Sequence, residues 1–88
     1  MKWSIERLEA EKTQDKELLG KIVLVVEGHK SPYEVTLHSK NGRDWSYSLN
    51  FAGASGPEEQ IDELEEQIEE DDDMFDSLTA AIKAHIAK

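Results

Sequence analysis

Two stretches of the chain alternate strictly between apolar and polar residues, and they constrain the fold more than any other feature. They span residues 33–38 and 45–51. Their apolar members are Tyr33, Val35, Leu37, Trp45, Tyr47, Leu49 and Phe51. Because a period of two is typical of a β-strand that buries one face, each stretch predicts a half-buried strand.

The connection between these two predicted strands contains an Asn-Gly pair. A two-residue turn at that pair would place Leu37 opposite Ser46 and would mix apolar and polar residues on one face, so the pattern argues against it. A three-residue loop over residues 40–42, with Gly42 in left-handed geometry, places Leu37 opposite Trp45 instead. We predict this second register.

A continuous apolar run from Ile22 to Val26 predicts a further strand over residues 21–27. In this strand Val23 and Val25 point away from the aromatic face, and they need a cover of their own. The N-terminal segment or a second copy of the chain would supply it. We favour a monomer with the N-terminal segment docked there, and a homodimer through Val23 and Val25 is the alternative.

The N-terminal arm, residues 1–20, fits two conformations. Ile5 and Leu8 are three residues apart, and Leu18-Leu19-Gly20 looks like the end of a helix. Trp3 and Ile5 are two residues apart, which fits a short strand equally well. The arm is therefore predicted to be helical or extended.

The C-terminal part reads as helical. Residues 52–57 form a linker of small residues that ends in Pro57, a good first residue for a helix. Apolar residues then recur at helical spacing. They are Ile61, Leu64, Ile68, Met74, Phe75, Leu78, Ile82 and Ile86. A run of acids interrupts this pattern, and we favour two helices with Asp73 as the N-cap of the second over one long helix.

These patterns together predict a single α+β domain over residues 1–88. It consists of a three-stranded antiparallel β-meander at residues 21–51, with two C-terminal helices from the acidic segment 58–88 packed on one face. The arm of residues 1–20 and the linker of residues 52–57 complete it.

The formal charge of −10 is confined to one part of the chain. Residues 1–57 carry eight acidic and eight basic residues, whereas residues 58–88 carry twelve acidic and two basic residues. The chain has no basic stripe of the kind that binds a phosphate backbone, so direct binding of nucleic acid is not expected. A basic protein is the partner that this charge favours.

The function that these features favour is a small, soluble, non-enzymatic module for protein interaction or regulation. Its predicted contact surface is acidic and helical. The candidate residues are Glu59, Asp62, Glu63, Glu66, Glu69, Glu70, Asp71 and Asp72.

Several other classes of function lack their sequence signals. The chain contains no cysteine, so disulfides, thiolate nucleophiles and cysteine-bound metals are excluded. The apolar run from Ile22 is far shorter than a membrane span, and the N-terminus leads into charged residues. We therefore expect a cytoplasmic protein without membrane contact and without a cofactor.

Two alternatives stay open at this point. A small-ligand binder or an enzyme would use the predicted hairpin face, with His38, His29 or Tyr47 as its titrating groups. Weak binding of a divalent cation would use Asp71–Asp73, although the spacing of acids there does not match a calcium loop. No catalytic motif accompanies either of them.

Overall fold

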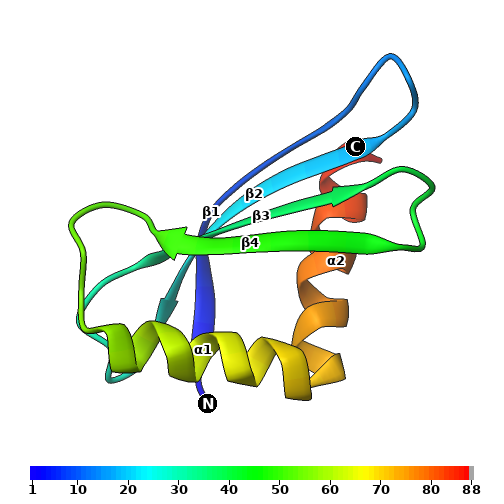
Figure 1. Ribbon diagram of the computed structural model, residues 1–88. Helices are drawn as coiled ribbons and strands as arrows, with labels where there is room; N and C mark the ends of the chain where they lie inside the picture. The colour runs from blue at the N-terminus through cyan, green and yellow to red at the C-terminus, as the bar shows by residue number, and fades with distance from the viewer. Residues whose placement is uncertain (88) are drawn as a thin grey trace.

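Four strands and two helices follow one another along the chain in the computed structural model, which describes residues 1–87 (Figure 1). They are β1 (Trp3–Lys12), β2 (Leu18–Val26), β3 (Tyr33–Ser39), β4 (Trp45–Phe51), α1 (Glu58–Glu70) and α2 (Asp72–Ile86). All pairings are antiparallel, and the strands lie side by side in the order in which they occur in the chain. The α+β class, the antiparallel meander and the two C-terminal helices are confirmed, but the meander has four strands and not three.

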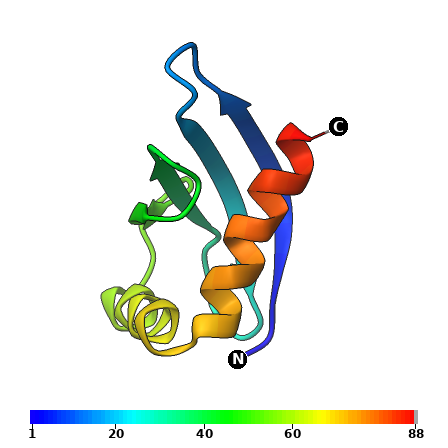
Figure 2. The same ribbon diagram turned by 90° about the vertical axis from the view of Figure 1, so that its right-hand side faces the viewer.

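Both helices cover the same face of the sheet. α1 runs along β4, and α2 packs across β1 and β2 (Figures 1 and 2). The even-numbered residues of β3 and β4, all polar, point to the opposite face, which neither helix covers. The molecule therefore has two layers, one of strands and one of helices.

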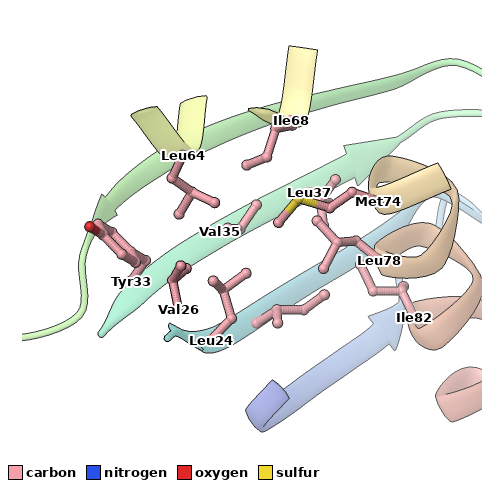
Figure 3. Packing of buried hydrophobic residues seen from close by; sticks show 11 residues of the cluster. Leu24, Val26, Tyr33, Val35, Leu37, Leu64, Ile68, Met74, Leu78 and Ile82 are labelled. Atoms are coloured by element: carbon pink, nitrogen blue, oxygen red, sulfur yellow. The ribbon is translucent and has the colours of Figure 1, made fainter. Parts of the chain in front are cut away.

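The core lies between these two layers. Figure 3 shows β2 and β3 presenting aliphatic side chains and Tyr33 to residues from α1 and α2. The buried set is Ile22, Leu24, Val26, Tyr33, Val35, Leu37, Leu64, Ile68, Met74, Leu78 and Ile82. Full burial of one such aliphatic side chain contributes about 1.5–3 kcal/mol to stability. Because residues of α1 and α2 complete this burial, the helices stabilise the sheet.

The N-terminal arm is the first strand of the sheet. Its extended alternative is correct, and the helical alternative is wrong. β1 has a bulge between Ile5 and Arg7, which leaves Glu6 as an extra residue in the pairing with β2. The bulge puts Ile5 and Leu8 on the same face although they are three residues apart, and this spacing imitates a helix.

The supposed helix end at Leu18-Leu19-Gly20 is also wrong, because these residues begin β2. Gly20 is buried, and a Cβ atom there would lie 2.5 Å from Cγ1 of Ile82 on α2. A glycine at this position lets the helix approach the sheet closely. It does not end a helix.

The predicted register of β3 with β4 is wrong by two residues. Leu37 lies opposite Tyr47 and Ser39 lies opposite Trp45, so the loop covers residues 40–44. Oδ1 of Asn41 accepts hydrogen bonds from the backbone N–H groups of the fourth and fifth loop residues, at 2.8 and 2.9 Å. This side-chain-centred turn stabilises the longer loop. Gly42 has a φ of 79°, as predicted for left-handed geometry.

The predicted cover of Val23 and Val25 by the arm is wrong. β1 pairs with the edge of β2, so both valines stay half-buried on the face without helices. An edge pairing satisfies backbone groups of the arm, which docking over the face would not do. Whether the chain associates through these valines stays a prediction.

Two helices are present, as favoured, and a single residue separates them. Asp71 is the N-cap of α2, and its Oδ1 atom accepts hydrogen bonds from the backbone N–H groups of Asp73 and Met74, at 3.0 and 3.2 Å. The predicted cap, Asp73, lies within the first turn instead. The cap falls two residues earlier because Asp71 has the extended backbone that an N-cap needs.

Candidate functional site

α1 is acidic along its whole length except for the stripe that enters the core. It carries eight acidic residues and no basic residue, and Leu64 and Ile68 are its buried residues. Pro57 precedes the helix, and Glu58 and Glu59 lie in the first turn, where negative charge is favoured. The sequence thus forms a helix that buries a narrow apolar stripe and presents carboxylates around the rest of its circumference.

The eight predicted contact residues fall into two groups. Four of them, Glu59, Asp62, Glu66 and Glu70, are exposed on α1. The other four make contacts of their own or line a pocket: Glu63, Glu69, Asp71 and Asp72. We define the exposed group as the acidic ridge.

The carboxylates of the helical segment are not neutralised within the part of the chain that the structure describes. Among residues 1–87, the ion pairs within 4.0 Å are His29 with Glu63 and His38 with Glu17. No lysine or arginine of residues 1–87 therefore pairs with any of the twelve acids of residues 58–76. The negative field of this segment therefore extends into the surrounding solvent.

A pocket of about 450 Å³ lies where β4 meets the junction of α1 and α2. Its ring side chains come from Trp45, Tyr47 and Phe75. Its carboxylates come from Glu69, Asp72 and Asp76. We call this the junction pocket. Aromatic faces beside carboxylates suit a cationic group, because ring faces and carboxylates both attract positive charge.

Tyr47 fixes one wall of the junction pocket. Its hydroxyl donates a 2.6 Å hydrogen bond to Oε1 of Glu69, and its ring meets that of Phe75 edge to face at 6.0 Å. Burial raises the pKa of the Tyr47 hydroxyl, and the hydrogen bond to Glu69 raises it further. Tyr47 is therefore a neutral hydrogen-bond donor at physiological pH.

His29, a predicted titrating group of the alternative site, belongs instead to a partly buried network near the N-terminal half of α1. Its Nδ1 atom lies 2.8 Å from the hydroxyl of Tyr33, and its Nε2 atom lies 3.5 Å from Oε1 of Glu63. Burial, followed by the charge of Glu63, raises the pKa of Tyr33. Tyr33 is fully buried and cannot meet a substrate, so this carboxylate, imidazole and phenol tie the β2–β3 loop to α1.

The residues of the alternative site do not come together. His38 lies on the face without helices, where its Nε2 atom pairs with Oε1 of Glu17 at 3.2 Å. Tyr47 lies on the opposite face, against α1 and α2. The hairpin alternative therefore has no shared constellation of titrating groups in this structure.

The acidic junction does not form a cation site within the described residues. The side-chain oxygens of Asp71 accept hydrogen bonds from two backbone amides and from Nε2 of Gln67, the latter at 3.0 Å. In residues 1–87 no group of three or more potential ligands converges. The carboxylate of Asp71 is thus occupied in capping α2.

Trp45, Phe75 and Asp76 were not assigned to a site from the sequence. The available signal was Phe75, which directly follows Met74 and therefore lies beside the buried stripe of α2 rather than within it. An aromatic residue at such a flanking position indicates a place at the rim of the core, where pockets form.

Within residues 1–87, neither helix has the length and apolar character needed to cross a membrane. Comparison of the chain with protein-family models, with curated proteins and with solved structures gives no significant match. The case for a function therefore rests on the geometry and the charge described above.

Proposed function

We propose that this protein is a small non-enzymatic interaction module that binds a basic partner protein through the acidic surface of α1 and the α1–α2 junction. The observation that carries this proposal is the set of twelve carboxylates at residues 58–76, which have no lysine or arginine partner within residues 1–87. A charge of this kind raises the rate at which a cationic protein meets the surface.

The arrangement of α1 supports the proposal further. Its apolar stripe is used in the core, so its exposed circumference offers a partner charge and little apolar area. Exposed ion pairs contribute about 0.2–1 kcal/mol each, and salt screens them over a distance of about 10 Å at 0.1 M. Binding through this surface must therefore use several carboxylates together and must weaken strongly in salt.

The test compares two variants with the same net charge. The ridge variant neutralises four residues of the acidic ridge. It carries Glu59→Gln, Asp62→Asn, Glu66→Gln and Glu70→Gln. The control neutralises four acids in β1 and the turn after it. It carries Glu6→Gln, Glu9→Gln, Glu11→Gln and Asp15→Asn. Each raises the formal charge from −10 by four, to −6.

Wild-type protein and both variants are immobilised and exposed to cell extract at low salt, and bound proteins are identified by mass spectrometry. We expect a basic protein to bind the wild type and the control, to bind the ridge variant about tenfold less, and to elute at about 0.5 M salt. Equal losses in both variants would mean that only total charge matters, and the proposed surface would be wrong.

A further inference from the structure

β4 forms an open edge of the sheet. Among residues 1–87, β3 is its one strand neighbour, and Figure 1 looks onto it with no other segment drawn across it. The strand has seven residues, Trp45–Phe51, with no charged residue and no proline. Its register with β3 runs without interruption, so it has no bulge. Natural edge strands usually carry charged residues, a proline or a bulge, because their unpaired backbone groups otherwise attract other strands.

The direction of the backbone groups along β4 follows from one hydrogen bond. The N–H of Ala52 donates to the carbonyl of Pro32 at 3.1 Å, so Ala52 faces β3. Backbone groups in an antiparallel strand alternate between its two neighbours. The residues of β4 whose N–H and C=O point away from the sheet are therefore the odd-numbered ones: Trp45, Tyr47, Leu49 and Phe51.

These outward-facing residues also place their side chains on the helix side of the sheet. In an added antiparallel strand, a residue opposite Tyr47 would direct its side chain to the same face, with its Cβ atom about 4.5–5.5 Å from that of Tyr47. That position adjoins the junction pocket, whose carboxylates are Glu69, Asp72 and Asp76. A basic side chain would meet both the aromatic walls and the carboxylates there.

Building on the function proposed above, we propose that the outer edge of β4 receives an extended segment of the basic partner as a fifth antiparallel strand, with a lysine or arginine side chain in the junction pocket. Backbone hydrogen bonds would then supply affinity, and the junction pocket would select the charge.

A second copy of this chain fits the same edge poorly. Pairing of β4 with β4 of another molecule would bring two acidic α1 helices together, since α1 lies along β4 in each copy. Like charges at close range oppose that association, whereas a basic segment is attracted. Charge complementarity therefore favours the basic segment as the occupant.

The test uses a synthetic peptide of about ten residues that alternates lysine with threonine, an extended and basic probe. With lysine side chains on the helix side, the lysine N–H groups face β4 and the threonine N–H groups face away. Backbone N-methylation at the lysines removes the donors to β4, and methylation at the threonines is the matched control. Both modified peptides keep the charge of the parent.

We expect methylation at the lysines to weaken binding about tenfold or more and methylation at the threonines to leave it nearly unchanged. Binding of the parent peptide should slow hydrogen exchange of the amides of Tyr47 and Leu49. The amides of Leu8 and Ala10, on the outer edge of β1, should not change.

A second comparison tests the junction pocket with variants of equal charge. Asp72→Asn with Asp76→Asn should weaken binding of the parent peptide more than Glu59→Gln with Glu66→Gln, because the first pair lines the pocket and the second lies on the acidic ridge. Equal effects would overturn the assignment of the basic side chain to this pocket.

The remaining outcomes separate this inference from the proposed function. If both methylated peptides bind equally and no β4 amide is protected, strand addition is wrong while binding to an acidic surface stands. If no cationic peptide binds at low salt, both proposals fail. Protection of β4 amides that rises with protein concentration in the absence of peptide would identify a second copy as the occupant and would overturn the inference.

Discussion

The two edges of the sheet differ in charge and in regularity, two features that control strand pairing. β1 carries charged residues along its length and is interrupted by a bulge at Glu6. β4 has no charge and no bulge, and its backbone is regular from end to end. The first edge is protected in the manner of natural sheet proteins, and the second is not.

The two helices also differ in how closely they pack on the sheet. α2 comes close to the β1–β2 side of the sheet, where Gly20 leaves room for Ile82. α1 meets β4 across larger side chains, and a hydrogen bond from Tyr47 to Glu69 connects the two elements. The β1–β2 side is thus closely packed against its helix and guarded at its edge, while the β4 side combines the junction pocket with free backbone groups. Binding surfaces are expected where packing leaves such room.

The largest expected effect comes from filling the space at Gly20. Gly20→Ala places a methyl group against the side chain of Ile82, and we expect it to lower the free energy of unfolding by about 1–3 kcal/mol. Urea denaturation measures this loss. The change would open the closely packed side of the molecule without touching β4.

Gly53→Ala is the matched control, because within residues 1–87 no atom beyond the adjacent residues of the chain lies within 4 Å of a Cβ at that position. Its effect should stay within about 0.5 kcal/mol. In the double variant with Ile82→Ala, the cost of Gly20→Ala should shrink, since the opposing side chain is gone. Equal losses for Gly20→Ala and Gly53→Ala would refute the close packing of α2.

A smaller effect is expected from removing the bulge in β1. Deletion of Glu6 lets β1 pair continuously and keeps Ile5 and Leu8 on the helix side, so the free energy of unfolding should change by less than about 1 kcal/mol. Because the neighbouring charges remain, this variant separates the guarding role of the bulge from that of charge. Chemical denaturation and sedimentation at several concentrations provide the two measurements.

Deletion of Glu9, from the regular part of β1, is the control. It forces Leu8 or Ala10 onto the face without helices, and we expect a loss of about 1–2 kcal/mol for the half-buried Leu8. If deletion of Glu6 proves as harmful as deletion of Glu9, the extra residue of β1 has been placed wrongly.

The smallest effect concerns the connection between β4 and α1 at alkaline pH. Burial and the hydrogen bond to Glu69 raise the pKa of Tyr47 above its ordinary value of 10.0, so the folded state holds this proton more firmly than the unfolded state. The resulting stability is complete below pH 10 and is lost as the pH rises above that value.

Tyr47→Phe removes this contribution. Between pH 9 and pH 11 the stability of the variant should therefore fall less than that of the wild type, by a few tenths of a kcal/mol after allowance for solvent screening. Glu69→Gln should have an intermediate effect. Parallel stability curves for wild type and Tyr47→Phe would show that Tyr47 gains nothing from its surroundings.

The sequence was sufficient for those elements whose periodicity is unbroken. The alternation at residues 45–51 and the apolar run from Ile22 identified strands, and the spacing of Leu64 and Ile68 identified a helix. The N-terminal strand was ambiguous because its bulge replaces a spacing of two by a spacing of three between Ile5 and Leu8. A bulge of this kind changes the spacing of the apolar residues, which is the main sequence signal that distinguishes a strand from a helix.

Two other errors have equally specific causes. A shift of two residues between β3 and β4 keeps Leu37 and Tyr47 on the same face as before, so the hydrophobic pattern could not choose between the registers. Gly20 suggested the end of a helix, whereas a glycine is needed there because α2 brings the distant residue Ile82 against it. Composition was sufficient to locate the acidic helix of the candidate site. The junction pocket could not be predicted, because it depends on the long-range contact between β4 and α2.

The order of the elements along the chain has a consequence for biosynthesis. The four strands leave the ribosome before either helix, and each can pair with its predecessor as it emerges. Their apolar face stays bare until residues 52–86 have been translated, an interval of about 2–7 s at 5–20 residues per second. During that interval the nascent sheet is open to chaperones and to neighbouring nascent chains. The helical segment ends this exposure, because it covers the apolar face and brings the excess of negative charge with it.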